Sequence, residues 1–349
     1  MTGLAVKLGL AGVGNSASVF LQGLKYYSGG EHKGLWHPNV AGLKPSDIQV
    51  VAAFDIDPRK VGLELSKAAF APPNVARRYL ALGKTRVTVD PGISKGDAAP
   101  HLAGVTLAKA GSEDVAKRLA DSGADILVNL ISSGSSASSE EYARAALRAK
   151  CAFINCTPAL VLKNNKIVAD FQRARLPLVG DDLMSQFGGT IFHKGLLGLM
   201  VRRGVKISKS YQLDVGGGSE TMNTVNEGIK MAKRAVKTTA VASEVPYNFE
   251  TIAGTTDFVD YMGNDRTSYF WFQGSGFMNS GISVDIYLRS SDGANAGNVL
   301  LDVVRATHRC LKLGKLGTVA EICAYGFKSP PKQMHYDEAL TKFSALYVR

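Results

Sequence analysis

The chain has 349 residues, of which 45% are hydrophobic and 20% are charged. This composition is typical of a globular protein that is long enough for two domains. No stretch approaches the roughly 18 apolar residues of a membrane span, and the chain does not start with a basic and then apolar signal segment. We therefore expect a cytoplasmic protein that does not bind membranes.

The charged residues, cysteines and histidines argue against several further classes of protein. The net charge is +11, yet the sequence shows no zinc-finger spacing, no aromatic RNA-binding signature and no long basic block. The four cysteines and six histidines lack the spacing of metal ligands, so we expect reduced, mostly buried thiols and no metal. The positive charge fits a phosphorylated small substrate or a merely solvated basic surface, and we expect no nucleic acid partner.

The first expected elements are a strand, a glycine turn and a helix. Residues 5–10 form a short apolar run, residues 12–17 read Gly-Val-Gly-Asn-Ser-Ala, and residues 20–27 carry apolar side chains at helical spacing. A dinucleotide-binding unit begins in this way. The alternative is an ordinary turn between a strand and a helix.

Each residue of this turn has a physical role if a nucleotide binds there. Gly12 allows the tight turn, and Gly14 lets backbone N–H groups approach a pyrophosphate. Asn15 and Ser16 begin the helix, whose free N–H groups attract phosphate. Ala17 stands where a third glycine is usual and is small enough for close packing of the helix on the strand.

Residues 49–54 predict a second buried strand, which ends at Asp55. An acid at this point normally binds the ribose hydroxyls, which favours NAD over NADP. It usually follows the glycines by about 20 residues, and an inserted loop over residues 29–48 accounts for the larger spacing here. The alternative role of Asp55, and of Asp57, is to cap a helix.

Strands and helices continue to alternate up to the helix expected over residues 191–201. The further expected strands are residues 125–130, 152–155 and 176–179. Such alternation predicts an α/β fold with a doubly wound parallel sheet, covered by helices on both faces. Ser138 with Glu141 predicts a capping box for one of these helices, over residues 139–150.

Polar residues follow these strands at the sheet edge where nucleotides and phosphates bind. Ser132, Ser133 and Thr157 are expected to contact a nucleotide there, although the serines also suit a plain flexible turn. Residues 180–190 gather acids, small hydroxyls and glycines before a helix. This arrangement binds phosphate through hydroxyl and backbone N–H groups, so Gly189 and Thr190 are candidate substrate contacts.

The character of the sequence changes after about residue 205. Residues 209–215, 269–272 and 282–288 are expected strands, and residues 295–313 are an expected helix. They predict a second α+β domain built on an antiparallel or mixed sheet. The exposed faces of that sheet are candidates for contacts between subunits.

Several blocks of sequence match one known family in order and over nearly the whole chain. They are residues 12–18, Gln22-Gly23, Tyr26-Tyr27, residues 51–57, residues 180–182 with Ser185-Gln186, Gly216-Gly217, Lys233 with Lys237, Asp292 with Asp302, and residues 328–331. In these blocks the chain resembles the myo-inositol-1-phosphate synthases in their shorter archaeal and actinobacterial form.

The resemblance implies a domain organisation and an assembly. Residues 1–200 would form a Rossmann-type NAD-binding domain, to which residues 290–349 return. Residues 201–289 would form the catalytic and tetramerisation domain. The resemblance also implies a homotetramer that keeps NAD bound throughout the cycle.

The resemblance further implies the reaction. Glucose 6-phosphate is opened, its C5 hydroxyl is oxidised by NAD, and the resulting ketone acidifies C6. The C6 enolate attacks the C1 aldehyde in an intramolecular aldol step, and the bound NADH then reduces C5. The product is 1L-myo-inositol 1-phosphate, with no net redox change.

The roles of individual residues follow from the same resemblance. Lys233 and Lys328 would handle the O5 and O1 oxygens and proton transfer, because ammonium groups stabilise developing negative charge in a site closed to water. Without the resemblance, each lysine would be interpreted as a solvated surface charge. The other implied roles are phosphate binding by Lys237, Ser185 and Gln186, orientation of a lysine by Asp292, contact with the nicotinamide by Asp182, and substrate contact by Glu220 and Asn223.

Four positions depart from the family pattern. Arg266 stands where the third active-site lysine is expected, and arginine cannot shuttle a proton. Glu220 replaces an aspartate, Gly218 an asparagine, and Ala232 a small hydroxyl residue. Together these departures indicate an altered substrate or ring size.

The leading hypothesis is an NAD-dependent cyclase that acts on glucose 6-phosphate. One alternative is a homologue that closes fructose 6-phosphate to a five-membered cyclitol phosphate, as in carbocyclic nucleoside pathways. The others are an ordinary dehydrogenase with an external hydride acceptor and a non-catalytic NAD-binding regulator.

Overall fold

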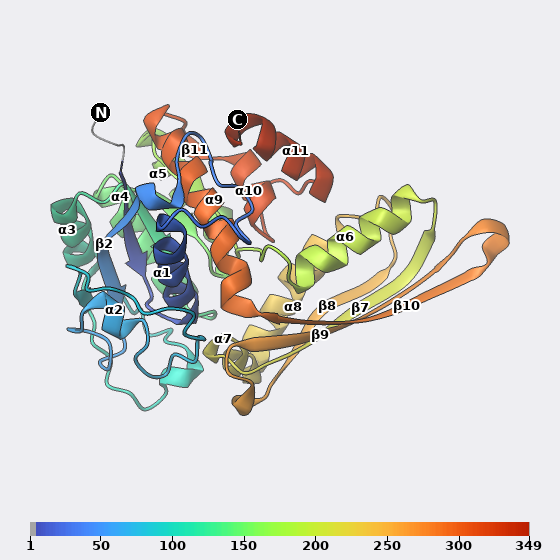
Figure 1. Ribbon diagram of the computed structural model, residues 1–349, viewed down its shortest axis with the longest axis horizontal. Helices are drawn as coiled ribbons and strands as arrows, with labels where there is room; N and C mark the ends of the chain where they lie inside the picture. Colours follow the sequence, from blue (N-terminus) through green and yellow to red (C-terminus); the bar gives the residue numbers. More distant parts are fainter. Residues whose placement is uncertain (1–4, 349) are drawn as a thin grey trace.

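Two sheets of different kinds lie side by side in the computed structural model, which describes residues 5–348 except for the side chain of Thr255 (Figure 1). Within these residues, the first sheet has seven strands in the order β11-β6-β5-β4-β1-β2-β3, and the second has four in the order β10-β9-β7-β8. The predicted fold class, a parallel doubly wound sheet with a second α+β unit, is confirmed.

The first sheet is parallel at every strand pair that is described. Its core strands are short and fully buried, as expected for a sheet with helices on both faces. The strands are β1 Val6–Ala11, β2 Ile48–Asp55, β3 Val89–Pro91, β4 Ile126–Asn129, β5 Ala152–Asn155, β6 Pro177–Val179 and β11 Gly317–Thr318.

Helices cover both faces of this sheet. Helix α1, Asn15–Ser28, packs against α9, Asp292–Lys312, on one face, and α3, Ser112–Ser122, packs against α4, Ser136–Arg148, on the other (Figure 1). The remaining elements of this half are α2 Leu65–Ala68, α5 Asn165–Arg173, α10 Ala320–Gly326, α11 Tyr336–Tyr347, and the short 3-10 helices η1 Pro45–Asp47, η2 Pro100–Leu102 and η3 Val161–Lys163.

The second sheet is mixed, which settles the alternative that the sequence left open. Strand β7 pairs in parallel with β8 and antiparallel with β9, and β9 forms a long hairpin with β10. Its elements are α6 Gly189–Arg202, β7 Lys206–Gly216, α7 Ser219–Met222, η4 Asn223–Val225, α8 Glu227–Ala242, β8 Glu250–Phe258, η5 Asp260–Met262, β9 Asp265–Ser275, η6 Phe277–Asn279 and β10 Gly281–Ser291.

Alternation along the strands gives this sheet two unlike faces. Phe270 and Phe272 are fully buried on the inner face, beneath α6 and α8. Their neighbours Tyr269 and Trp271 point to the other face, which no described helix covers. The inner face therefore builds the local core, and the outer face is left for other contacts.

Helix α9 connects the two sheets. It begins at Asp292, directly after β10, and packs against α1 and against β5 and β6 of the first sheet. Its first turn therefore lies where the two sheets meet, and the chain after it adds β11 to the edge of the first sheet.

One local prediction is wrong. Helix α4 begins at Ser136, so Ser138 lies inside its first turn rather than at its start. The Ser138 hydroxyl donates to the Asp97 carboxylate, and no capping box with Glu141 forms. The loop that carries Asp97 reaches this helix from far away in the sequence, which a local pattern cannot indicate.

Within residues 5–348, no helix combines the length and the apolar character needed to cross a bilayer. The cysteines in this part of the chain are free thiols, and Cys151, Cys310 and Cys323 are buried.

Candidate active site

The glycine turn after β1 is held against the rest of the sheet edge by its backbone. Gly12 has a φ of +88°, and a Cβ at this position would lie 2.8 Å from the carbonyl oxygen of Leu130. Its N–H donates to the carbonyl of Phe54 at 2.8 Å. Only glycine suits such a conformation with backbone this close.

The turn leaves open space where a nucleotide phosphate needs it. Gly14 is the N-cap residue of α1, and no heavy atom lies within 4 Å of the position of its missing Cβ. As a glycine it provides no side-chain cap, so the first N–H groups of α1 remain available to an anion. These residues therefore fit a dinucleotide.

Asp55 lies at the carboxyl end of β2, as predicted, and lines a cavity together with Gly12. One carboxylate oxygen accepts from the N–H of Val13 at 2.8 Å, and the other accepts from the N–H of Asp57 at 2.9 Å. Asp55 thus fixes the glycine turn and still faces the cavity.

This first cavity adjoins a second one. Five residues line both: Gly14, Leu130, Ile131, Ser132 and Ser219. The first cavity runs from these residues to Asp55, and the second runs from them to the second sheet. An elongated ligand bound along the sheet edge would therefore have one end in each cavity.

Four cationic side chains from three separate segments line the second cavity. Lys233 and Lys237 lie one turn apart on α8, Arg266 lies on β9, and Lys328 follows α10. Gly14 of the nucleotide turn lines the same cavity. The structure therefore brings together the lysines that the sequence placed far apart.

Lys233 is paired with Glu220. Its ammonium lies 2.7 Å from the Glu220 carboxylate and also donates to the Glu220 backbone carbonyl at 3.3 Å. The second carboxylate oxygen of Glu220 accepts from the N–H of Ser133 at 3.2 Å. Burial raises the pKa of Glu220, but Lys233 and Ser133 outweigh it and lower that pKa overall. Glu220 thus links the second sheet to the loop after β4.

Lys237 is paired with Asp214 on β7, at 2.7 Å between ammonium and carboxylate. Asp214 is completely buried and does not line the cavity, whereas Lys237 does. Burial lowers the pKa of Lys237 and the Asp214 carboxylate opposes this shift.

Arg266 and Lys328 also have carboxylate partners. The Arg266 guanidinium lies 2.9 Å from the carboxylate of Asp292. The Lys328 ammonium lies 2.6 Å from the carboxylate of Asp182 and donates to the carbonyl of Leu183 at 3.0 Å. Arg266 also lies 3.9 Å from the Asp214 carboxylate, so each of the four cations has at least one carboxylate partner.

Most of the predicted site residues line one of the two cavities. Gly12 and Asp55 line the first, and Gly14 and Ser132 line both. Those that line the second are Asn15, Ser16, Thr157, Asp182, Ser185, Gly189, Thr190, Glu220, Lys233, Lys237, Arg266, Asp292 and Lys328.

Four predicted residues line neither cavity. The Gln186 amide oxygen accepts from the side-chain amide of Asn298 at 2.7 Å, and Asn223 contacts a ring nitrogen of His101 at 3.1 Å. Ala17 is buried in α1, and Ser133 acts through its bond to Glu220. The substrate contacts expected of Gln186 and Asn223 therefore stay predictions.

Two of the lining residues also hold loops. The Asn15 side chain accepts from the N–H groups of Val75 and Ala76, at 2.8 and 2.9 Å. The Thr157 hydroxyl accepts from the N–H of Ala159 at 3.1 Å. Both residues shape the site, whatever they contribute to a ligand.

The sequence did not predict a group of polar residues on β7, of which Gln212 lines the second cavity and the other two do not. Ser210, Gln212 and Asp214 alternate along β7 and are all buried on its inner face. The sequence does carry a signal for them, because three polar residues alternate along this strand shortly before the glycines at 216–218. Within residues 5–348, no group of His, Cys, Asp or Glu side chains has the arrangement of a metal site.

A family model and full-length relatives match this chain. The family model described as "Myo-inositol-1-phosphate synthase" matches residues 188–293. An inositol-3-phosphate synthase of Corynebacterium glutamicum is 31% identical over 361 residues, which cover 100% of this chain and 99% of that protein. The inositol-3-phosphate synthase of Mycobacterium tuberculosis is 33% identical over 351 residues, 98% of this chain and 96% of its own.

Solved structures agree with this relation. The crystal structure of Ari2 shares 31% sequence identity, with a TM-score of 0.78, over 98% of this chain and 99% of that one. A myo-inositol-1-phosphate synthase-related protein from Thermotoga maritima has the same fold, with 19% identity, a TM-score of 0.81 and 98% coverage of both chains. The resemblance that the sequence indicated is confirmed. The chain is an enzyme that belongs to the myo-inositol-1-phosphate synthase family.

Proposed function

We propose that the protein is an NAD-dependent cyclase that converts glucose 6-phosphate to 1L-myo-inositol 1-phosphate. The observation that carries this proposal is the cavity shared by Lys233, Lys237, Lys328 and the Gly14 turn. Full-length relatives named inositol-3-phosphate synthase support the same reaction. Membership of an enzyme family leaves no role for the non-catalytic alternative.

The first half of the chain holds the cofactor. The turn at Gly12 and Gly14 and the amino end of α1 bind the pyrophosphate, and Asp55 binds the ribose at the adenosine end. When bound, NAD supplies a hydride acceptor for the C5 hydroxyl and later a hydride donor to the same carbon. Asp182 lines the second cavity, where the nicotinamide end of the cofactor would lie.

The lysines of the second half stabilise negative oxygens of the open-chain sugar. Charge develops on O5 when the C6 proton is removed and on O1 when C6 attacks the aldehyde. Lys233 and Lys328 supply ammonium groups to these oxygens, in a site whose cations are largely withdrawn from water. The same two lysines transfer protons, since each can exchange a proton with a neighbouring carboxylate or with the substrate.

The phosphate of the substrate is bound by Lys237, Ser185 and the amino end of α6. Gly189 and Thr190 start that helix and line the cavity, so their N–H groups are free to meet an anion. Lys237 lies across the cavity and adds a positive charge. The phosphate thereby fixes one end of the sugar while its other end reacts.

A second candidate substrate is fructose 6-phosphate, closed to a five-membered cyclitol phosphate. The observation that favours it is Arg266, which lines the cavity and whose Nε has no hydrogen-bond partner in the described part of the chain. A guanidinium cannot deprotonate, so Arg266 binds and orients oxygen atoms instead of moving protons. A contact between Arg266 and a substrate oxygen suits fructose 6-phosphate, whose carbonyl is at a different carbon from that of glucose 6-phosphate.

The test is an incubation of the purified protein with NAD and either sugar phosphate, followed by product identification with ³¹P and ¹³C NMR. We expect inositol phosphate from glucose 6-phosphate and no steady accumulation of NADH, because the cycle returns its hydride. A five-membered cyclitol phosphate would establish the second candidate. Continuous NADH production with an open-chain product would refute both and establish an ordinary dehydrogenase.

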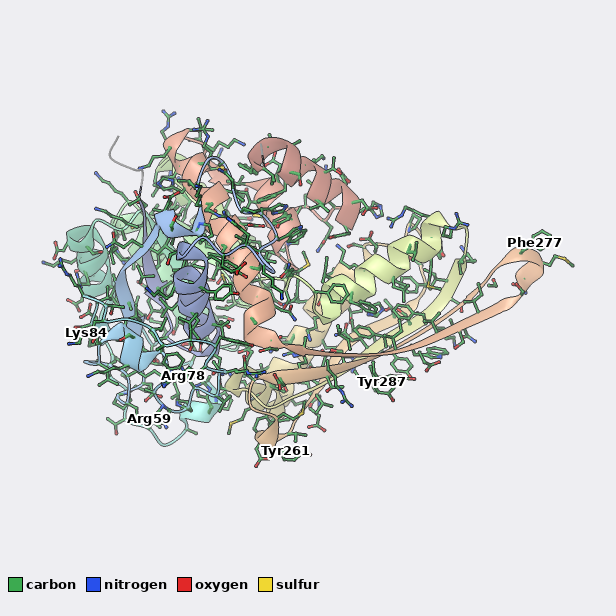
Figure 2. All side chains as sticks on the ribbon, viewed as in Figure 1. Arg59, Arg78, Lys84, Tyr261, Phe277 and Tyr287 are labelled. Atoms are coloured by element: carbon green, nitrogen blue, oxygen red, sulfur yellow. The ribbon has the colours of Figure 1, made fainter. Side chains whose placement is uncertain are left out.

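We also propose that the enzyme is a homotetramer whose subunits meet through the outer face of the second sheet. Aromatic side chains project from this face, and Tyr287 is 72% exposed on β10 (Figure 2). Phe277 lies at the exposed tip of the same hairpin (Figure 2). Light scattering of the wild type should give four subunits, and Tyr287→Asp should give smaller species; a wild-type monomer would refute the assembly.

A further inference from the structure

Asp214 is a charged residue that lies close to the cavity without being part of its wall. Its side chain is 0% exposed, on the inner face of β7. One carboxylate oxygen accepts from the amide of Gln212 at 2.8 Å and from the hydroxyl of Ser268 at 2.6 Å. The other oxygen accepts from the ammonium of Lys237 at 2.7 Å. The strands thus fix the carboxylate, and its second oxygen faces the Lys237 ammonium and, at 3.9 Å, the Arg266 guanidinium.

The stem of Lys237 is also confined. Gly254 on β8 has a φ of +81°, and a Cβ on this residue would overlap the Lys237 side chain. The glycine therefore makes room for the aliphatic stem to run along the strand. Gly254 against the stem and Asp214 at the ammonium therefore confine the Lys237 side chain to one buried path to the cavity.

We propose that Asp214 is a positioning residue that keeps the Lys237 ammonium charged and aimed into the cavity, where Lys237 binds an anionic substrate oxygen and does not act as a base. This inference rests on the proposed function, because it takes a phosphorylated sugar as the occupant of the cavity. It assigns a task to a carboxylate that does not touch the substrate.

The charged groups around Lys237 explain why it needs this partner. Burial lowers the pKa of Lys237, and the nearby cations Arg266, Lys233 and Lys328 lower it further. Asp214 opposes these shifts but does not cancel them, so the pKa of Lys237 stays below its usual value and would fall further without this carboxylate.

The Asp214 carboxylate itself stays ionised. Burial alone would raise its pKa, yet Lys237 and Arg266 hold this pKa well below the usual range. His193 also faces Asp214, but burial lowers the pKa of its imidazole to about 4, so this histidine is neutral at physiological pH. Asp214 is thus a permanent negative charge beside Lys237.

The other lysine pairs differ in one respect. The partners of Lys233 and Lys328 are Glu220 and Asp182, and both carboxylates line the cavity. Those two carboxylates are therefore within reach of a substrate in the cavity. Asp214 lies outside the wall, so a substrate cannot displace it, and Lys237 keeps its charge throughout the reaction.

The test measures the proton affinity of Lys237 directly, without substrate. The wild type and Asp214→Asn are labelled with acetic anhydride across neutral and alkaline pH, and modification of Lys237 is quantified by mass spectrometry. In the variant, we expect labelling to begin at a pH lower by about one to three units, because the opposing charge is gone. Asp292→Asn is the matched control: it removes a carboxylate beside Arg266, which stays charged, so Lys237 labelling should stay close to the wild type.

A second measurement follows binding of inorganic phosphate by calorimetry. In Asp214→Asn, phosphate affinity should fall as the pH rises through neutrality, whereas the wild type keeps its affinity to higher pH. Identical labelling curves in the two proteins would overturn the proposal. Labelling of Lys237 in the wild type at neutral pH would also overturn the proposal, and this result does not require the variant to fold. If Asp214→Asn shifts the labelling of Lys237 but the wild type makes no cyclic product, the proposed reaction is refuted. The effect of Asp214 on Lys237 then still stands.

Discussion

The two halves of this molecule build their parts of the site in different ways. In the nucleotide half, the contacts come from the backbone of one turn, where Gly12 and Gly14 follow each other within a single loop. In the other half, they come from side chains on separate elements, such as Lys237 on α8 and Arg266 on β9. The first kind of site depends on chain geometry, and the second depends on the arrangement of charge.

This difference determines what each half tolerates. A turn made of backbone groups fails when a side chain intrudes, because the neighbouring carbonyl of Leu130 cannot move away. A cluster of paired charges fails when one partner is removed, because the other charge stays buried without compensation. Substitutions in the two halves should therefore separate nucleotide binding from catalysis.

The largest effect is expected from Lys233 and Lys328, the lysines proposed to contact the reacting oxygens. Lys233→Ala or Lys328→Ala should lower kcat by about a thousandfold or more, since each loses charge stabilisation and proton transfer together. NAD binding, measured by fluorescence titration, should change little. Lys230→Ala on the same helix lies outside the cavity lining and is the control. Wild-type turnover in both active-site variants would contradict the assigned roles.

A substitution in the glycine turn should act on NAD binding, which the lysine substitutions leave nearly unchanged. Gly12→Ala places a Cβ against the carbonyl of Leu130 at a positive φ, so it should weaken NAD binding by about a hundredfold, which is about 2.7 kcal/mol. Gly23→Ala lies on α1 with no neighbour within 4 Å of its Cβ and should leave affinity unchanged. Equal NAD affinities in Gly12→Ala and the wild type would show that the nucleotide does not bind at this turn.

The last expected effect is on stability rather than on turnover or NAD binding, and it concerns the buried polar residues of the second half. Burial lowers the pKa of His193 from 6.5 to about 4, so the folded state resists its protonation while the unfolded state accepts it. The stabilisation is complete above pH 6.5 and is lost as the pH falls toward 4, by about 3 kcal/mol in the free energy of unfolding. His193→Asn should remove this part of the pH dependence in urea titrations. An unchanged slope in the variant would mean that His193 takes up its proton at the same pH in the folded and the unfolded protein.

The parts that could be predicted from the sequence are those with local causes. The strand before Gly12, the helix after it and the acid at Asp55 are all encoded within short windows, and the structure places them together. The lysines could be proposed because a family resemblance ties distant positions to one site. Neither source of information depends on how the second sheet packs.

The remaining features depend on contacts between distant segments. Asp214 pairs with Lys237 only because α8 packs on β8, which pairs with β7, and no spacing in the chain expresses that. Gln186 turns away from the cavity because its backbone N–H donates to Asn295 and its side chain meets Asn298. Ser138 failed as a cap for the same reason, since its partner Asp97 comes from another loop.

The central claim is that cations of the second half surround a sugar phosphate beside the nicotinamide held by the first half. A crystal structure with NAD and a non-cyclising open-chain hexitol 6-phosphate tests it most directly. We expect hexitol density in the cavity lined by Lys233, Lys237 and Lys328, with its C5 carbon facing the nicotinamide ring and its C5 oxygen facing the lysines. Hexitol density elsewhere, or a dinucleotide bound away from the turn at Gly12 and Gly14, would contradict the account.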